Sequence, residues 1–566
     1  MRKNILASFI ALLALQASGS TTWTLNNKTY QVDTLFHAQI GPGTTMTSLK
    51  LEGPVKFRIF YTTTDLKNKN VDVRAIKHTD RLAGVSTISE AMKTHSTDSR
   101  RYFAGVNADF FSKTSPCGIT VVDNEVYGSA QSDGWYLFGM NANRLPMIGT
   151  GELAITVTSA SGKNFTSYKL NRSRSANELV LYTPRFGSST ATANDGTEVM
   201  LSPIDDNNNL TPGTQVTMKV VGSPSVGTGN AAIPDGGYIL SGNGLAAEFL
   251  NELKSGDEVK LRCAVRFNGI TGGKVAQALG GCPPILSGGN VLDTDKVLDH
   301  LSTAQPRTAV GYNAARDTLV MLVADGRSAI SVGPISKVLA GMMKCAGCTE
   351  ALNFDGGGSS ELYTDTFGVV NVPTDGGERK VTNGLYLSTD TPKDDVIAKI
   401  AFKDYAKTLG VGETYSPVIY GYNQYGVLID TDVKGCKLST ADGETFSATE
   451  AGCYPLTASY AGLTASIAVT VNNNGGVIDI NTASNAISYY PNPVKQGNDV
   501  FIDIDSATEA TIYIYDTDGS LLSAQRHTAD NGKFSISTSR LTQGIYMLKV
   551  IPDNNISNNL VKLIVY

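Results

Sequence analysis

Three consecutive glycines lie between two apolar, strand-like runs, and this arrangement constrains the chain more than any other feature. Residues 351–363 read Ala-Leu-Asn-Phe-Asp-Gly-Gly-Gly-Ser-Ser-Glu-Leu-Tyr. Glycine permits a positive φ and a close approach of backbone to ligand, and consecutive amides in such a loop can form an anion-binding concavity. We interpret the segment from Asp355 to Ser360 as a site that holds an anion and moves a proton, in preference to a plain β-turn with solvent-facing serines.

Two common phosphate-binding motifs do not fit this loop. It lacks the G-x-G-x-x-G spacing of a dinucleotide site, and it lacks the Gly-Lys-Ser/Thr ending of a P-loop. No G-x-S-x-G nucleophile elbow surrounds it either. The loop therefore needs another chemical explanation.

Length and composition set the class of protein. The 566 residues are too many for one domain, and 41% apolar content is enough for several cores. Only 17% of residues are charged and the formal net charge is −5, with no basic block, so a nucleic-acid partner is not expected. Residues 1–20 have the pattern of a signal peptide, and no later run is long enough to predict an integral membrane protein.

The chain is expected to fold as an α+β catalytic domain with mixed or antiparallel sheets, followed by two all-β sandwich domains. The expected boundaries are a signal peptide at 1–20, a catalytic domain at 21–392, and sandwiches at 393–473 and 486–566. A polar linker is expected at 472–485.

The segment before the glycines carries the sharpest structural signals. Thr318–Ala324 predicts a buried strand that ends at Asp325, and Pro334 is expected at the first position of a helix. Gly347 is a natural C-terminal stop for that helix, and a strand into Asp355 follows. Strand, helix and strand therefore converge on the glycine loop.

Other polar motifs accompany the loop. Arg307 and Thr308 begin a strand, and a guanidinium suits a phosphate because its fork matches two oxygens. Asp325 stands at a strand terminus. Asn107, Asp109 and the aromatic pair that follows could line a sugar pocket. Taken singly, each has an ordinary structural explanation: a surface ion pair, an Asp-Gly turn and a strand end with core phenylalanines.

The seven cysteines offer pairing in an exported protein, and Cys436 with Cys453 is the pair we expect. Cys345-x-x-Cys348 has no second pair and no nearby histidine, so a zinc site is not expected.

Five segments, in order, resemble the phosphodiester glycosidase family. They are Asn107-x-x-Phe-Phe111, Ala278-x-Gly-Gly-x-Pro283, Arg307-Thr-Ala-x-Gly311, Ala324-Asp-Gly326 and Ala351-Leu-Asn-Phe-Asp-Gly-Gly-Gly-Ser-Ser360. The chain departs from the family pattern at Asp109, where glycine is usual, at Glu361, where threonine is common, and at Val338, where Glu is frequent.

The resemblance implies cleavage of sugar 1-phosphodiesters, of the N-acetylglucosamine-1-phosphodiester type, at the anomeric carbon. The implied catalytic residues are Asp355, Asp325 and Arg307, since glycoside hydrolysis uses paired carboxylates. The implied substrate-binding residues are Asn107, Asp109, Thr308, Gly356, Gly357, Gly358, Ser359 and Ser360. No cofactor is required, but a divalent cation held by Asp109, Asp325 and Asp355 is an alternative.

The last two regions have resemblances of their own. Residues 396–472 look like a bacterial Ig-like domain. Tyr490-Pro-Asn-Pro493, Ile512-Tyr-Ile-Tyr-Asp516, Gly544-Ile-Tyr-Met-Leu-Lys549 and Lys562-Leu-Ile-Val565 resemble the sorting domain of type IX secretion. The expected partners are the secretion machinery and a sugar-phosphodiester or cell-envelope glycan, and the expected location is secreted or on the cell surface. A non-catalytic glycan-binding protein on the same scaffold is the alternative function, and a structural adhesin is a third.

Overall fold

The computed structural model describes residues 21–205, 209–268, 274–294, 297, 299–472, 487–492, 494–504, 508–516, 521–529, 533–552 and 559–565. The predicted signal peptide at 1–20 and nearly all of the predicted linker at 472–485 lie outside the described residues. The chain divides into two compact units. The first is Met1–Ala406, Ser416–Glu444 and Leu456–Ile467, and the second is Lys407–Tyr415, Thr445–Pro455 and Ala468–Tyr566.

Strands dominate the described chain, with three α-helices: α1 (Ile88–His95), α2 (Leu245–Asn251) and α3 (Ser336–Cys345). A nine-stranded sheet runs in the order β1 (Thr21–Leu25), β2 (Lys28–Gly41), β3 (Thr44–Glu52), β4 (Phe57–Asp65), β24 (Thr318–Ala324), β23 (Arg307–Tyr312), β25 (Glu350–Asn353), β21 (Pro284–Ser287) and β22 (Asn290–Val291). A five-stranded sheet contains β27 (Gly368–Val369), β26 (Leu362–Thr364), β6 (Arg101–Asn107), β28 (Asn383–Thr389) and β5 (Asp72–Lys77). A short hairpin, β7 (Phe111–Ser112) and β8 (Ser115–Pro116), follows β6.

Alternation along β24 explains how these two sheets are layered. Leu319, Met321 and Val323 join a core shared with residues of the five-stranded sheet, such as Val106. Val320, Leu322 and Ala324 point the other way, into a core with α3. Successive strand residues face opposite sides of a sheet, so a wholly apolar strand must be covered on both faces. Helix α1 covers the outer face of the five-stranded sheet.

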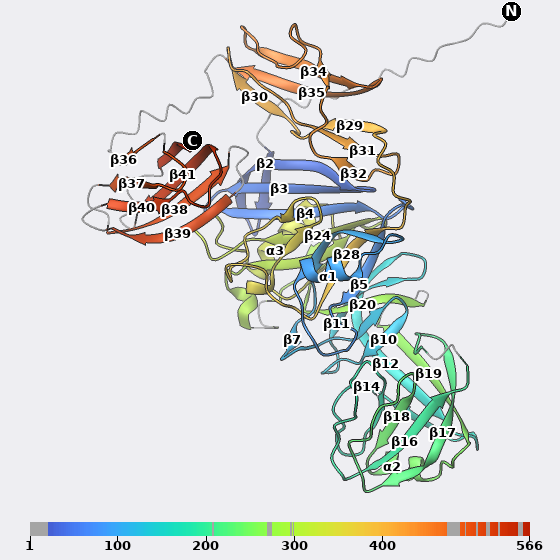
Figure 1. Cartoon of the computed structure of the whole chain (residues 1–566). Helices are drawn as coiled ribbons and strands as arrows, with labels where there is room; N and C mark the ends of the chain where they lie inside the picture. The colour runs from blue at the N-terminus through green and yellow to red at the C-terminus, as the bar shows by residue number, and fades with distance from the viewer. Residues whose placement is uncertain are drawn as a thin grey trace, which may run out of the picture. The chain divides into compact units, whose positions relative to one another are not determined.

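A third sheet extends into a separate lobe of the first unit (Figure 1). Its order is β10 (Glu125–Gly128), β9 (Thr120–Val122), β20 (Val275–Gly281), β11 (Tyr136–Asn141), β12 (Pro146–Thr158), β19 (Glu258–Phe267), β17 (Gln215–Val226), β16 (Thr197–Pro203), β18 (Tyr238–Gly242), β15 (Leu179–Tyr182) and β14 (Lys169–Leu170), with β13 (Asn164–Ser167) beside β12. The long strand β12 pairs with β11 through its first residues and with β19 through its last ones. It therefore connects the site-bearing sheets to the lobe, which has its own apolar core with α2.

Part of the region predicted as Ig-like belongs to the first unit. Strands β29 (Lys399–Phe402), β31 (Ile419–Tyr422) and β32 (Leu428–Asp430) form a small sheet, and Tyr420 and Tyr422 share an apolar cluster with Ala38 of β2. The Tyr422 hydroxyl donates to the Gln39 carbonyl at 2.9 Å. The Ig-like domain at 393–473 stays a prediction.

The remaining strands complete the chain. In the first unit, β33 (Lys437–Leu438) pairs with residues 458–459 of β34 (Gly452–Tyr460). In the second unit, β30 (Lys407–Gly410) pairs in parallel with the end of β35 (Leu463–Asn472). The C-terminal part of the second unit has two sheets, which enclose one apolar core. The first sheet has the order β36 (Ile487–Tyr490), β37 (Asp499–Ile504) and β40 (Lys533–Ser537). The second has the order β39 (Leu521–Thr528), β38 (Glu509–Asp516), β41 (Gly544–Pro552) and β42 (Asn559–Val565).

The structure corrects two expectations. All seven cysteines are free thiols, so the expected Cys436–Cys453 disulfide is absent. Helix α3 begins at Ser336 with Ile335 as its N-cap, so Pro334 precedes the helix instead of opening it. The predicted C-terminal stop is confirmed, because Gly347 lies just beyond the helix with φ +96°.

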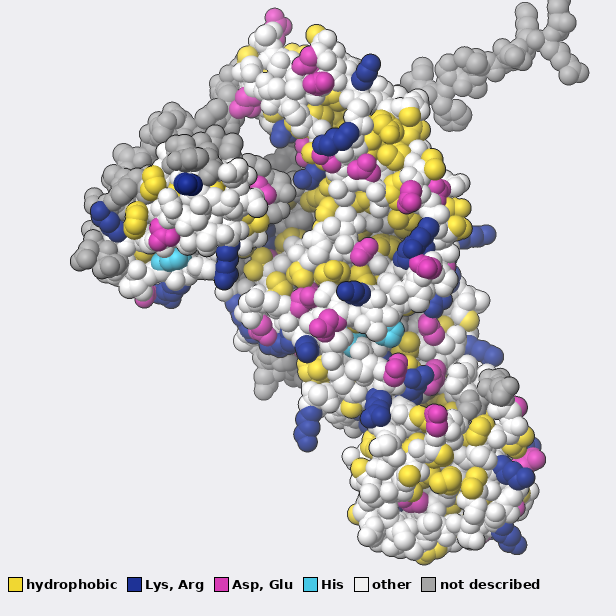
Figure 2. Space-filling model, viewed as in Figure 1, with side chains coloured by type: hydrophobic (Ala, Val, Ile, Leu, Met, Phe, Trp, Pro, Cys, Tyr) yellow, Lys and Arg dark blue, Asp and Glu magenta, His cyan; other side chains and the backbone are white. Residues whose placement is uncertain are grey.

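The surface carries charges of both signs. Acidic and basic side chains are interspersed on the face drawn in Figure 2. Within the described residues, no helix is long and apolar enough to cross a bilayer.

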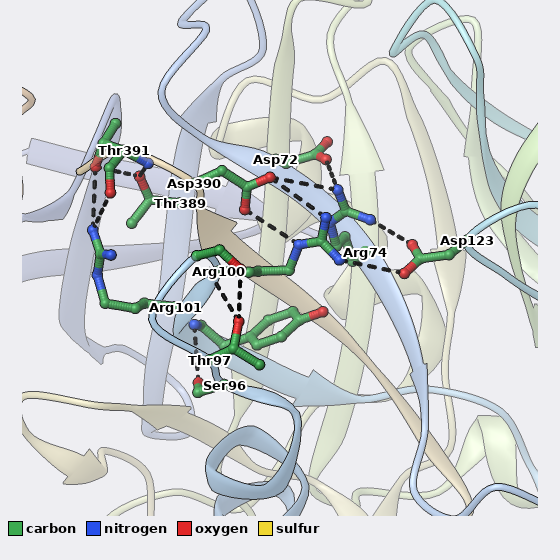
Figure 3. Close-up of polar contacts among 12 residues, drawn as sticks. Asp72, Arg74, Ser96, Thr97, Arg100, Arg101, Asp123, Thr389, Asp390 and Thr391 are labelled. Carbon is green, nitrogen blue, oxygen red and sulfur yellow. Dashed lines mark hydrogen bonds and ion pairs between the residues drawn. The ribbon is translucent and has the colours of Figure 1, made fainter. Parts of the chain in front are cut away.

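One group of charges ties strand ends of the first unit together (Figure 3). Arg74 on β5 pairs with Asp72 at 2.8 Å and with Asp123 of the β9–β10 turn at 2.5 Å. Arg100 reaches Asp123 at 3.6 Å and Asp390, just after β28, at 3.2 Å. The Arg74 side chain is only 14% exposed, so this network is better shielded from water than an ordinary surface pair.

We expect a double-mutant cycle of Arg74→Ala and Asp123→Ala to give a coupling free energy of about 0.5–1 kcal/mol, which falls in high salt because screening weakens the attraction. Urea unfolding is the measurement. The matched control is the exposed pair Lys163–Glu252, whose side chains are 59% and 53% exposed and whose coupling should be near zero. Equal couplings for the two pairs would contradict this account of the network.

Candidate functional site

The glycine loop is the place where the chain crosses from one packed sheet to the other. It leaves the nine-stranded sheet after β25 and enters the five-stranded sheet at β26. A single turn of 3₁₀ helix at Gly357–Ser359 makes the crossing, and Gly357 has φ +62°. The predicted strands on both sides of the loop are confirmed.

Asn107 clamps this crossover at the end of β6. Its Nδ2 donates to the Asp355 carbonyl at 2.7 Å, and its Oδ1 accepts from the Glu361 amide at 3.2 Å. The same oxygen accepts from the Thr308 hydroxyl at 2.7 Å. The side chains of Asn107 and Thr308 are buried, and these polar atoms bind the protein itself. In the structure both residues position the loop.

The loop amides are partly engaged within the loop. Gly356 N–H donates to Asp355 Oδ1 at 2.9 Å, and Gly357 N–H donates to the Pro306 carbonyl at 2.9 Å. The amides of Ser359 and Ser360 donate back to the carbonyls of Gly356 and Gly357. The amides of Gly356 and Gly357 thus have acceptors within the protein, and the anion-binding role expected of residues 356–358 stays a prediction. Among the described contacts of these three amides, only that of Gly358 has no acceptor.

Asp355 is a partly buried carboxylate at the start of the loop. Burial raises its pKa to about 6, and the Ser359 hydroxyl, the Gly356 amide and the charge of Arg379 act in the opposite direction. A carboxyl poised near neutrality in a site is typical of acid–base and nucleophilic groups.

Asp109 is the carboxylate coupled to Asp355. The Asp355 amide donates to the Ala108 carbonyl at 2.8 Å, which brings the two segments side by side. Asp109 is buried, and it accepts from the Gly118 amide at 2.7 Å and from Trp135 Nε1 at 3.2 Å. Burial raises its pKa to about 7, and the charge of Asp355 adds to that rise.

Asp325 contacts a different segment beside the loop, at residues 371–372. Its Oδ1 accepts from the Val372 amide at 2.9 Å and from Asn371 Nδ2, which also donates to the Ser360 carbonyl at 3.1 Å. Burial raises its pKa to about 7, opposed by Val372, Asn371 and Arg58. The charge of Asp355 thus acts on Asp109, whereas Asp325 holds the segment at 371–372.

Arg307, expected to bind phosphate, is buried beneath the loop. Its guanidinium donates to the carbonyls of Pro334 at 3.2 Å and Thr303 at 3.0 Å, and burial lowers its pKa to about 10. It lies close to the backbone of Gly356. Its described side-chain bonds therefore connect it to the segments at Thr303 and Pro334.

Two other arginines border the glycines, and the sequence analysis missed them. A Cβ on Gly357 would lie 3.1 Å from an Arg327 nitrogen, and one on Gly358 would collide with Arg379 and Asp375. Arg327 is exposed, and Arg379 is 40% exposed. Arg327 follows Asp325-Gly326 directly, so that motif was an available signal. Arg379 stands in a polar loop with no recognisable pattern.

Several buried polar atoms around the loop lack a partner among the described residues. They are Asn353 Oδ1, Ser360 Oγ, Glu361 Oε1, Thr382 Oγ1 and Asn383 Nδ2. Buried polar groups are nearly always hydrogen-bonded, so such a gathering is typical of a site that takes water or ligand. Glu361 differs from the others, because burial and a hydrogen bond to Glu378 raise its pKa to about 9.

The cation alternative gains no support. Within the described part of the chain, no group of three or more His, Cys, Asp or Glu side chains is placed to hold a metal ion.

Two segments of the chain match known families. Residues 208–388 match the phosphodiester glycosidase family, and residues 488–566 match the secretion system C-terminal sorting domain. The chain carries a phosphodiester glycosidase domain and a sorting domain. The first match includes the glycine loop, Arg307 and Asp325, but Asn107 and Asp109 precede it.

Individual relatives are distant. The prophage-derived uncharacterized protein YomE of Bacillus subtilis (strain 168) is 36% identical over 95 residues, which are 17% of this chain and 14% of that protein. An exported protein of Burkholderia pseudomallei K96243 is 18% identical, with a TM-score of 0.50 over 66% of this chain and 99% of that one, and it shows a shared fold.

Two further structures are similar at a lower level. A Synechocystis protein is 16% identical, with a TM-score of 0.49 over 61% of this chain and 62% of that one. The zebrafish N-acetylglucosamine-1-phosphodiester alpha-N-acetylglucosaminidase catalytic domain, auto-inhibited by its pro-peptide, is 11% identical, with a TM-score of 0.32 over 63% and 87%.

We expect Asn107→Ala to lower the free energy of unfolding by about 2 kcal/mol, because buried groups at Glu361, Thr308 and Asp355 lose their partner. Denaturant unfolding measures this. Asn164→Ala is the control, since Asn164 makes its side-chain bond at an exposed position and its loss should cost less than about 0.5 kcal/mol. Equal costs would show that the Asn107 clamp contributes nothing particular.

Stability should fall as pH rises from 5 to 8, and Asp325→Asn should reduce that fall. The raised pKa means that the folded protein binds this proton more tightly than the unfolded chain does. The resulting stabilisation is complete below the unfolded pKa and is lost as pH rises through about 7. Asparagine keeps an oxygen for the Val372 amide and does not ionise. Melting temperatures at both pH values test this, with exposed Asp133→Asn as the control; an unchanged slope in Asp325→Asn would contradict it.

Proposed function

We propose that the first unit hydrolyses sugar 1-phosphodiesters, of the N-acetylglucosamine-1-phosphodiester type, at the anomeric carbon. The observation that carries this proposal is the surroundings of Asp355. A partly buried carboxylate with a pKa near 6 stands at the start of a glycine loop, where the charge of an arginine lowers its pKa and where its own charge raises the pKa of a second carboxylate. The match of residues 208–388 to the phosphodiester glycosidase family supports the same reaction class.

The phosphate is assigned to the exposed border of the loop. The Gly358 amide, Arg327 and Arg379 supply a backbone donor and two guanidinium groups there, of which that of Arg379 is paired with Asp375 at 2.5 Å. A side chain at position 357 or 358 would occupy the space between the backbone and these arginines, which explains why glycine is needed at both positions. Arginine matches phosphate because its planar fork donates to two oxygens at once.

Asp355 in its ionised form acts at the anomeric carbon, either by direct attack or by taking a proton from water. A phosphate monoester departs as a stabilised anion, so the bond breaks with less help from an acid than an ordinary glycoside needs. The net reaction adds one water and yields a free sugar and a phosphate monoester.

A non-catalytic glycan-binding role is the second candidate. It is favoured by the engagement of Arg307 with backbone carbonyls and by the inward bonds of the Gly356 and Gly357 amides, which leave fewer groups for a transition state.

The sorting domain at 488–566 supports an exported protein that is secreted or stays on the cell surface. We infer that the type IX secretion machinery is the partner of this domain and that the substrate is a sugar phosphodiester or a glycan of the cell envelope.

Incubation with an alkyl phosphodiester of N-acetylglucosamine 1-phosphate should release free N-acetylglucosamine. Asp355→Asn should lower kcat by about a thousandfold or more. The rate should fall as pH drops below about 6, because the ionised carboxylate is the active form. Binding of the substrate without release by the intact protein would contradict the enzyme and favour the glycan-binding role.

Substitutions of the arginines distinguish an effect on substrate binding from an effect on folding. Arg327→Ala and Arg379→Ala should raise KM with little change in melting temperature, since both side chains reach solvent. Arg307→Ala should lower the melting temperature, because its buried bonds to Thr303 and Pro334 are lost. The reverse ranking would return the phosphate to Arg307.

A further inference from the structure

Two aromatic rings from distant parts of the sequence meet beside Asp109. Phe110 follows Asp109 at the end of β6, and Trp135 precedes β11 in another sheet. Their ring centroids are 6.0 Å apart at an interplanar angle of 85°, an edge-to-face arrangement. Both residues are partly exposed. They are therefore available to a ligand while being anchored in the fold.

The indole of Trp135 is held in place by the buried carboxylate. Asp109 Oδ1 accepts from Trp135 Nε1 at 3.2 Å, while Oδ2 accepts from the Gly118 amide at 2.7 Å. Two glycines make room for this contact. A Cβ on Gly280 would lie 2.3 Å from Asp109 Oδ1, and one on Gly118 would lie 2.8 Å from the indole ring. A ring fixed in this way loses little conformational entropy when it binds.

This aromatic pair borders the carboxylate assigned to the reaction. The Asp355 amide bonds to Ala108, two residues before Phe110, and Asp355 is electrostatically coupled to Asp109. Asp355 also interacts with Arg379 at the glycines. Asp355 is thus connected to the aromatic pair through Asp109 and to a cationic side chain, Arg379, at the glycines.

A polar atom without a partner completes the surroundings. Asn383 Oδ1 accepts from the Asp109 amide at 3.0 Å, whereas its Nδ2 has no acceptor among the described residues although the side chain is buried. Asn383 thus offers an unused amide donor next to Asp109, the residue that holds the partly exposed indole. A pyranose has an apolar C–H face and polar substituents at its edge, so an aromatic ring and a nearby polar group suit a sugar.

We propose that Trp135 and Phe110 form the subsite for the sugar ring of the phosphodiester, with the ring stacked on the indole and Asn383 Nδ2 bonded to a polar substituent. Asp109 is the positioning residue that fixes the indole. This proposal rests on the proposed function, in which the phosphate lies at Arg327 and Arg379 and the anomeric carbon lies at Asp355. Asp109 gives this subsite its anchor, because one of its oxygens is bonded to the indole and the other to the Gly118 amide.

The chain has only two tryptophans, Trp23 and Trp135, which allows a direct test. In a Trp23→Phe background, the fluorescence of Trp135 should change on titration with free N-acetylglucosamine and stay constant with inorganic phosphate. In the converse Trp135→Phe background, which leaves Trp23, the sugar should produce no change. No response of Trp135 to the sugar, in a protein that melts normally, would overturn the subsite.

The steady-state kinetics of variants provide a second test of the subsite. Trp135→Ala should raise KM by about tenfold with a smaller change in kcat, because stacking contributes mainly to binding. Asp109→Asn keeps an oxygen for the indole and should retain more affinity than Asp109→Ala. Trp23→Phe is the matched control for kinetics and melting temperature, because Trp23 packs against the core under α3.

The two proposals fail in different ways. Turnover without any effect of sugar or of Trp135→Ala would overturn the subsite and leave the glycosidase function intact. A fluorescence response to the sugar without turnover of any sugar phosphodiester would overturn the enzyme and support the subsite as a glycan-binding site.

Discussion

The site depends on one constraint, the passage of the chain between two packed sheets within a few residues. The glycines of the crossover have no side chains with which to pack it in place. Side chains from other segments therefore hold it. The Asn107 side chain does this by bonding to Asp355, Glu361 and Thr308 together. One amide group thereby fixes where a nine-stranded sheet, a five-stranded sheet and the reactive loop meet.

Burial of the crossover has an electrostatic consequence. Asp109, Asp325 and Asp355 all have raised pKa values, and in each case burial is the largest cause. Three carboxyls whose pKa values are raised in the folded protein lower its stability once they ionise. A structural loop gains nothing from that cost, whereas a site that moves protons near neutral pH needs it. This contrast is the physical reason for reading the loop as a site of chemistry.

Local sequence patterns predicted strands and helix ends better than they predicted the contacts of individual side chains. The apolar run at 318–324 predicted β24 with its observed bounds, and Gly347 predicted the end of α3. The loop was recognised because glycine and acid occur together in a short segment. The sequence does not reveal that the Arg307 guanidinium is buried and bonded to two backbone carbonyls, and its expected role at the phosphate stays a prediction. Trp135 gave no local signal, because its contact with Asp109 exists only through the pairing of separate sheets.

The central claim is that Asp355 faces the anomeric carbon of a sugar whose phosphate lies at the glycines. A crystal structure of the Asp355→Asn protein with a non-hydrolysable sugar 1-phosphonate ester tests this most directly. The account predicts phosphonate oxygens at Arg327, Arg379 and the Gly358 amide, with the anomeric carbon next to residue 355. Phosphonate bound to Arg307, or a sugar seated away from residue 355, would contradict it.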